Sequence, residues 1–332
     1  MKITNWLSLS KQQQIDLINQ TGSQTGLPPY AIEKDAWVTL VLRMLFRSEI
    51  CPYLVFKGGT SLSKAYNLIE RFSEDIDLAI SRDYLGFGGE LSRGQIRKLR
   101  RKSHDFSANA FPQILQNQLS EYGIEEQLYE ITVPNIKISD QDPEIVHVNY
   151  KSVFEEESYL QSRVLIEISA RSLMEPFESK IIQSLIDQNN ENTDFSEETF
   201  SVNTVIPEKT FLEKLILLHE EFQKPKEKIR YHRMSRHLYD IGQIINTEYG
   251  KKAIENRILF ENILGHREMF TPVKTVDYKK LTLKSLSFLP PDDFLDLYRI
   301  DYREIQTNLI YGESLKFNKL IEQLISFKNL ME

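Results

Sequence analysis

Two short stretches decide the fold: FKGGTS at residues 56–61 and DIDLAI at residues 75–80. The first stretch ends a short apolar run, which is typical of a strand, and turns at two glycines toward a helix expected over 61–69. In the second stretch, acids alternate with apolar residues, which predicts a strand with one apolar face. A strand, a glycine turn, a helix and a second strand together indicate an α+β fold.

The second stretch carries a pair of carboxylates suited to a metal ion. Asp75 and Asp77 are two positions apart on the predicted strand, so their side chains face the same side. Like charges held this close repel each other, and a cation relieves the repulsion. Hard divalent ions take oxygen ligands, so the pair suits Mg²⁺. Alone, such a pair is usually solvated surface, and only its combination with the preceding glycine turn favours a metal site.

The glycine turn is a candidate phosphate site. Gly58 and Gly59 lack a Cβ, so their backbone N–H groups can approach a triphosphate closely. A helix that begins near Thr60 would direct its positive N-terminal end toward the same anion. Two adjacent glycines alone more often form a plain tight turn. With Thr60 and Ser61 after them and the Asp pair beyond, they indicate nucleotide binding.

A third carboxylate, Glu167, stands in the apolar run 164–168. Burying a lone carboxylate is unfavourable, so an acid in such a run requires a metal ion or a cation nearby. The alternative is an ion pair with Arg163 or Arg171. We expect Glu167 to join the two aspartates as a metal ligand.

The rest of the chain divides near Pro207. Helices are expected at 10–21 and 30–47, and further strands at 129–138, 145–153, 163–169 and 199–206. From Glu208 onward, apolar residues recur at helical intervals. We therefore expect an α+β domain over residues 1–207, with a mixed sheet flanked by helices, and a helical domain over residues 208–332.

The composition is that of an ordinary globular protein, with 41% hydrophobic residues and a net charge of −7. The single cysteine, Cys51, permits no internal disulfide, which suits a reducing compartment. The first ten residues do not resemble a secretory signal. No apolar run approaches the roughly 18 residues needed to span a bilayer. These features predict a cytoplasmic protein that does not enter the membrane.

One segment is strongly basic despite the negative net charge. Between residues 93 and 104 it contains no acid and six cations: Arg93, Arg97, Lys98, Arg100, Arg101 and Lys102. Such a cluster is typical of surfaces that follow a phosphate backbone. The alternatives are a flexible charged loop and a face that docks on an acidic protein partner.

Several of these segments together resemble the polymerase-β-like nucleotidyltransferase superfamily. Within it, the chain is similar to the AbiEii/AbiGii toxin family of abortive-infection and toxin–antitoxin systems, which act in phage defence. The similar segments are EKDAWV at 33–38, ERFSEDIDL at 70–78, KTFLEKL at 209–215 and SRHLYDI at 235–241. Fifteen residues separate Gly59 from Asp75. This is more than the usual superfamily spacing, but it is the longer form that the AbiEii group shows.

The resemblance implies that a nucleoside monophosphate is transferred from an NTP to an acceptor. Asp75, Asp77 and Glu167 would then be catalytic residues that hold Mg²⁺ or Mn²⁺. It also implies an essential lysine and aspartate, here Lys214 and Asp240, through which the helical domain completes the active site.

The resemblance also implies roles for residues of the segments 209–215 and 235–241. Lys214 would contact the NTP phosphates, and Asp240 would orient it or act on the acceptor hydroxyl. Arg236 is a candidate second phosphate contact. From spacing alone, Lys214 would be a solvated helix residue paired with Glu213 or Glu220.

The acceptor and partners also follow from analogy. Some relatives modify the 3′ end of tRNA, so tRNA is the leading acceptor, and an antitoxin is the expected protein partner. One alternative is an idle NTP-binding or protein-interaction module. Another is an enzyme that modifies a protein. His219, His232, His237 and Cys51 lack zinc-ligand spacing and are interpreted as structural or surface residues.

Overall fold

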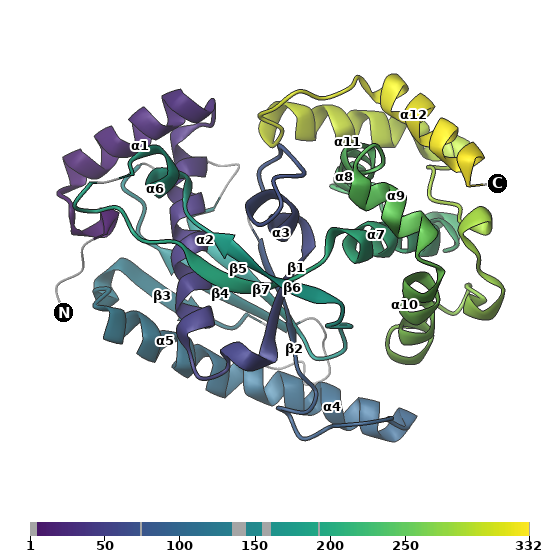
Figure 1. Ribbon diagram of the computed structural model, residues 1–332, viewed down its shortest axis with the longest axis horizontal. Coiled ribbons are helices and arrows are strands. Elements are labelled where there is room, and N and C mark those ends of the chain that lie inside the picture. Colours follow the sequence, from purple (N-terminus) through teal and green to yellow (C-terminus); the bar gives the residue numbers. More distant parts are fainter. Residues whose placement is uncertain (1–4, 74, 135–143, 155–160, 192, 332) are drawn as a thin grey trace. The chain divides into compact units, whose positions relative to one another are not determined.

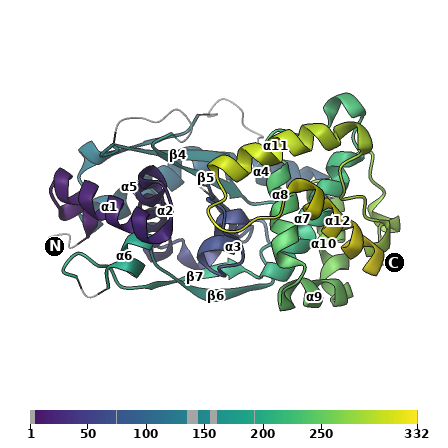
Figure 2. The ribbon, with the colours of Figure 1, turned by 90° about the horizontal axis from the view of Figure 1, so that it is seen from above.

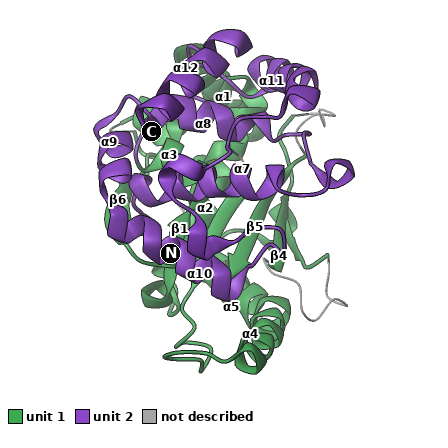
Figure 3. Ribbon diagram, turned by 90° about the vertical axis from the view of Figure 1, so that its right-hand side faces the viewer, with its two compact units in different colours: residues 1–65, 74–204 green, residues 66–73, 205–332 purple. Residues whose placement is uncertain are grey.

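The computed structural model describes residues 5–73, 75–134, 144–154, 161–191 and 193–331. The chain forms two compact units (Figure 3). Unit 1 comprises residues 1–65 and 74–204, and unit 2 comprises residues 66–73 and 205–332. The segment 66–73, which lies within the expected N-terminal domain, therefore belongs to the helical unit.

A seven-stranded mixed sheet forms the centre of unit 1, in the order β3-β4-β5-β2-β1-β7-β6 (Figure 1). The strands are β1 (Leu54–Lys57), β2 (Asp75–Ile80), β3 (Tyr129–Thr132), β4 (Glu144–Tyr150), β5 (Arg163–Ser169), β6 (Phe177–Ile182) and β7 (Phe200–Val205). Strand β2 runs antiparallel to β1 and parallel to β5, and β4 runs antiparallel to both β5 and β3. The predicted α+β fold is confirmed.

Six α-helices are described in unit 1: α1 (Lys11–Thr25), α2 (Pro29–Arg47), α3 (Gly58–Lys64), α4 (Arg93–Asp105), α5 (Phe111–Tyr122) and α6 (Leu185–Asn189). A capping box between Ser10 and Gln13 begins α1. Pro29 occupies the first turn of α2, where its missing N–H leaves no bond unmade. Helix α2 is buried along almost all its length and contacts β2 and β5. It thereby covers the apolar face of the strands that carry the three acids.

The observed elements differ from the predicted ones at a few places. The strand at 163–169 is confirmed, and those at 145–153 and 199–206 each differ at the ends by a few residues. The strand expected at 129–138 ends at Thr132, and its last residues lie outside the described residues. Helix α3 begins three residues earlier than expected and ends at Lys64, and Asn67 then adopts a left-handed φ of 52°.

Unit 2 is helical, as the 3.6-residue periodicity predicts. Its helices are α7 (Pro207–Phe222), α8 (Ser235–Ile244), α9 (Glu248–Glu255), α10 (Arg257–Phe270), α11 (Leu295–Asn308) and α12 (Phe317–Leu330). Helix α8 contacts α7, α11 and α12 (Figure 2). The segment 66–73 is bound to this unit by backbone hydrogen bonds from Phe72 N to Leu309 O and from Tyr311 N to Glu70 O. Among the described helices, none combines the length and apolar character needed to cross a membrane.

Candidate active site

The register of β2 and β5 brings the three predicted metal ligands onto one face of the sheet. Asp77 pairs directly with Glu167. Asp75, two residues earlier on β2, pairs with Leu165, two residues before Glu167 on β5. These residues are half-buried, whereas Ile76 and the other alternating residues of both strands are buried in the core. Neighbouring strands lie roughly 4.8 Å apart, so the three carboxylates form a compact cluster.

The electrostatics of the cluster fit a divalent cation. Burial, reinforced by the charges of Asp77 and Asp75 and by a hydrogen bond with Asp77, raises the pKa of Glu167 to about 7. Lys57, which pairs with Asp77 across β1 and β2, acts in the opposite direction. Repulsion among oxygen ligands of this kind is what a bound divalent ion relieves. The donor set therefore suits Mg²⁺ or Mn²⁺.

Gly58 has a structural reason to be glycine. Its φ is +80°, and a Cβ built there would lie only 1.9 Å from Oδ2 of Asp77. The sequence interpretation attributed this glycine to the close approach of a triphosphate. The structure adds another reason, because the Asp77 carboxylate occupies the space that a side chain at Gly58 would need. Gly59 follows in the first turn of α3.

The two hydroxyl residues after the glycines hold the turn in place. Thr60 Oγ1 donates a hydrogen bond to the backbone carbonyl of Asp75, and Ser61 Oγ donates one to the carbonyl of Gly58 at 2.8 Å. Both residues are buried. The glycine turn and the strand that carries the aspartates are thus tied together. Glu74, expected from sequence to be solvated, lies outside the described residues.

A second cluster lies in unit 2, around the fully buried Asp240. Arg71 binds both carboxylate oxygens, with Nε 2.7 Å from Oδ1 and Nη2 2.8 Å from Oδ2. Lys214 Nζ lies 2.9 Å from Oδ2. Burial alone would raise the pKa of Asp240, but the charges of Arg71 and Lys214 hold it well below its usual range. The interpretation of Lys214 as a solvated residue paired with Glu213 or Glu220 is therefore wrong.

Two members of this second cluster had no functional role in the sequence interpretation. One is Arg71, whose partner Asp240 is 169 positions away in the chain. The other is His237, whose Nδ1 lies 3.5 Å from Lys214 Nζ. Burial, and then the charges of Lys214 and Arg236, lower the pKa of His237 well below its usual value, so the ring is neutral near pH 7. A neutral ring nitrogen can accept a hydrogen bond from the lysine.

Several charged groups act on one another in this cluster. Arg71, Lys214 and Arg236 are basic, and Asp240 is acidic. Burial lowers the pKa of Lys214, and the charges of Arg71 and Arg236 act in the same direction, against that of Asp240.

The basic segment forms a helix, α4, so the flexible-loop alternative is wrong. Its N-terminus has a capping box between Ser92 and Gln95, and Leu99 and Ser103 are buried on its inner side. Most of its cations are exposed: Arg93, Arg97, Lys98, Arg101 and Lys102. Arg100 is half-buried. A regular, capped helix presents these charges in fixed positions.

Two of the histidines interpreted as structural or surface residues differ in their surroundings. His219 accepts a hydrogen bond from Ser287 N at 3.0 Å, which agrees with a structural role. His232 lies near Asp301 and Glu304, with ligand atoms within 4.8 Å of one another, a grouping that the spacing of histidines alone could not reveal.

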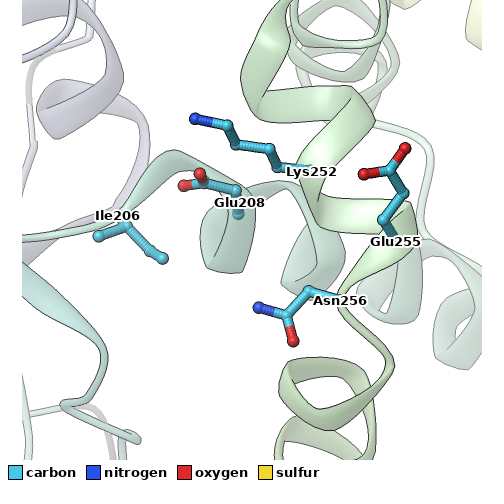
Figure 4. Close-up of a pocket in the computed structure, with 5 residues that line it drawn as sticks. All are labelled: Ile206, Glu208, Lys252, Glu255 and Asn256. Atoms are coloured by element: carbon cyan, nitrogen blue, oxygen red, sulfur yellow. The ribbon is translucent and has the colours of Figure 1, made fainter.

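Unit 2 also contains a cavity of about 420 Å³, and none of the residues that line it was predicted for the site (Figure 4). It is lined by Ile206, Glu208, Lys252, Glu255 and Asn256.

Comparison with known proteins places the chain in a family. A model of the nucleotidyl transferase AbiEii toxin of type IV toxin–antitoxin systems matches residues 40–327. Among solved structures, the nucleotidyltransferase toxin MenT4 of Mycobacterium tuberculosis is 14% identical, with 98% of this chain and 99% of that chain covered and a TM-score of 0.46.

A structure from Helicobacter pylori is 15% identical, with coverage of 92% and 96% and a TM-score of 0.45. No curated protein shows a significant match to the chain. Because the family model spans most of the sequence, the chain belongs to the AbiEii family of nucleotidyltransferase toxins of type IV toxin–antitoxin systems.

Proposed function

We propose that this nucleotidyltransferase moves a nucleoside monophosphate from an NTP to an RNA acceptor, with Asp75, Asp77 and Glu167 as ligands of Mg²⁺ or Mn²⁺. The observation that carries the proposal is the register of β2 and β5, which places three carboxylates on one face. A bound divalent ion supplies charge neutralisation at the phosphates and at the attacking oxygen. In the transfer, a bond forms between the acceptor oxygen and the α-phosphorus while the bond to pyrophosphate breaks.

The residues of the chain then bind and orient the reactants. The backbone at Gly58 and Gly59 binds the triphosphate. Thr60 holds this turn against β2, and Ser61 closes the turn on Gly58. Positioning of this kind accounts for much of the acceleration in phosphoryl transfer.

Lys214 and Arg236 contact phosphate oxygens, as the family resemblance implies. Asp240 has the role of a positioning residue, because both of its oxygens are already bonded to cations and its side chain is fully buried. That arrangement supports the orienting role for Asp240 over direct action on the acceptor hydroxyl. His237 offers Lys214 a further hydrogen-bond partner, with its Nδ1 3.5 Å from the lysine Nζ.

The acceptor we propose is RNA, with the 3′ end of tRNA as the leading candidate. The exposed cations of α4 support a polynucleotide, because fixed charges along a helix suit successive phosphates. A protein acceptor is the second candidate, and a cognate antitoxin is the expected partner of the family. Docking of an antitoxin on α4 is the competing use of that helix.

One assay separates these acceptors. The purified protein is incubated with each α-³²P-labelled NTP, together with either total bacterial RNA or total protein, in Mg²⁺, Mn²⁺ or EDTA. We expect label in an RNA band of tRNA size, with one NTP preferred and no label in EDTA. Label in protein alone would favour the second candidate. Absence of label with every NTP would favour an idle binding module.

A further inference from the structure

The half-buried face that carries the acids continues beyond them onto β4. Ile145 pairs directly with Glu167, so His147 and Asn149, two and four residues later, lie on the same face. Arg163 lies on this face of β5 and pairs with Asn149. His147 pairs with Leu165 and is therefore diagonal to both Arg163 and Glu167, at roughly the 7–8 Å typical of such neighbours.

These side chains are chemically suited to a nucleotide, and the reaction proposed above has not used them. Burial, and then the charge of Arg163, lower the pKa of His147, so its neutral ring offers one donor and one acceptor. Asn149 Nδ2 donates to Thr132 Oγ1 at 3.1 Å, which fixes the orientation of its amide. Arg163 offers a planar fork of donors that matches phosphate oxygens. All three side chains are half-buried rather than solvated.

The order of the strands indicates where the two reactants would lie. The glycine turn follows β1, the aspartates are on β2, Glu167 is on β5 and His147 is on β4. In phosphoryl transfer, the attacking and leaving oxygens lie roughly in line on opposite sides of phosphorus. If the triphosphate lies at the β1 side, as the proposed function holds, the acceptor must approach from the side of β5 and β4.

We infer that His147, Asn149 and Arg163 form the subsite for the terminal nucleotide of the acceptor. Arg163 binds a phosphate of that nucleotide, and His147 and Asn149 bind its sugar or base. This inference rests on the proposed function, since it assumes that the acceptor is a polynucleotide.

The test is a steady-state comparison in which total bacterial RNA and the NTP are varied in turn. Arg163→Gln and His147→Gln should each raise the apparent KM for RNA by about tenfold or more, the loss expected for one charge-assisted or buried hydrogen bond. The KM for NTP should stay within about twofold. Arg163→Lys should recover part of the RNA affinity. Lys180→Gln, a cation on the opposite edge strand β6, is the matched control and should leave both constants unchanged.

Three outcomes would overturn the inference. A rise in the KM for NTP instead of RNA would move these residues to the nucleotide side, and unchanged constants would remove them from the site. If the wild-type protein labels no RNA at all, the proposed acceptor is wrong and the subsite falls with it. Melting temperatures identify a misfolded variant, and Asn149→Ser, which removes only the amide, then gives a second test with the same expected split.

Discussion

At the scale of single residues, the surroundings of Asp240 and Gly58 explain why each position requires its residue type. Asp240 has no exposed surface, and each of its oxygens is bonded to a cation. A buried charge is tolerated only when such partners are present. Gly58 is defined by the Asp77 carboxylate, which fills the position of the missing Cβ. A single substitution at either residue, compared with a matched control variant, therefore tests the explanation.

Replacing Asp240 with asparagine should destabilise the protein by about 3–5 kcal/mol, because Arg71 and Lys214 are left buried without their counter-charge. The pKa of Asp240 is lowered in the folded state, so its stabilising contribution is full above the unfolded pKa of about 4 and is lost as the pH falls below it. The difference in unfolding free energy between wild type and Asp240→Asn should therefore shrink between about pH 4 and pH 2.

Urea unfolding at several pH values measures this difference. The control is Asp296→Asn, which removes an exposed carboxylate paired with Arg299 on α11. It should change stability by less than about 1 kcal/mol. An equally small effect at Asp240 would mean that the buried network contributes little to stability.

Gly58→Ala should abolish most activity, because the new Cβ would displace the Asp77 carboxylate from its position beside Glu167. The matched control is Gly86→Ala. Gly86 has a similar φ of +84°, but a Cβ there would meet no atom within 4 Å. Both variants should lose similar stability from backbone strain, of order 1 kcal/mol. Nucleotidyl transfer and melting temperature would be measured for both, and equal activity in the two would contradict the packing explanation.

At the scale of elements, helix α4 is the part whose role is most open to experiment. Changing four exposed cations, Arg93, Arg97, Lys98 and Arg101, to glutamine should weaken RNA binding and leave NTP binding unchanged. Each lost phosphate contact also removes counterion release, so the slope of log K against log salt should fall by about 3 for single strands. Filter binding across a range of salt concentrations measures both quantities.

The control carries the same change in net charge elsewhere, through glutamine at four exposed cations of unit 2: Lys251, Lys279, Lys280 and Lys319. An unchanged salt slope in the α4 variant would remove this helix from the RNA site. Normal RNA modification with impaired neutralisation by the antitoxin would identify α4 as the antitoxin surface instead.

The elements that could be predicted from sequence are those with a clear periodicity. Strand β5 alternates buried and half-buried residues, and the helices of unit 2 repeat apolar residues at helical spacing, so both were predicted. Strand β6 was missed because it is a sheet edge whose residues are mostly exposed, which leaves no apolar pattern. Helix α4 was missed because its cations obscure the few apolar residues of its inner face.

The residues of the candidate site also divide into those that could be predicted from sequence and those that could not. Asp75, Asp77 and Glu167 could be singled out, because acids inside apolar strands are conspicuous. The Arg71–Asp240 pair could not, because it joins residues 169 positions apart that local spacing does not relate. The family resemblance indicated Asp240 but gave no partner for Arg71.

At the scale of the whole molecule, the chain passes from one unit to the other at three points, after residues 65, 73 and 204. The short segment 66–73 carries Arg71 into unit 2, and four residues later Asp75 begins the strand with the aspartates. A short stretch of chain thus links Arg71, a member of the network around Asp240, to strand β2, which carries the proposed metal ligands.

Expression of the full chain in a bacterial host, without its antitoxin, should arrest growth. Asp75→Ala should relieve the arrest, because it removes one ligand of the proposed metal site without disturbing the apolar face of β2. Growth curves, with immunoblots to confirm equal soluble protein, measure this effect. Undiminished arrest by the variant would attribute the toxicity to something other than nucleotidyl transfer.

The most direct test of metal-dependent transfer is a labelling assay on Asp75→Asn and Asp77→Asn. An amide is nearly the same size as a carboxylate but is a poor ligand for Mg²⁺, so the fold should be kept while the metal site is lost. We expect transfer from labelled NTP to RNA to fall to the level of the EDTA control in both variants, with unchanged circular dichroism. Wild-type transfer by both folded variants would contradict the assignment of this carboxylate cluster as the catalytic centre.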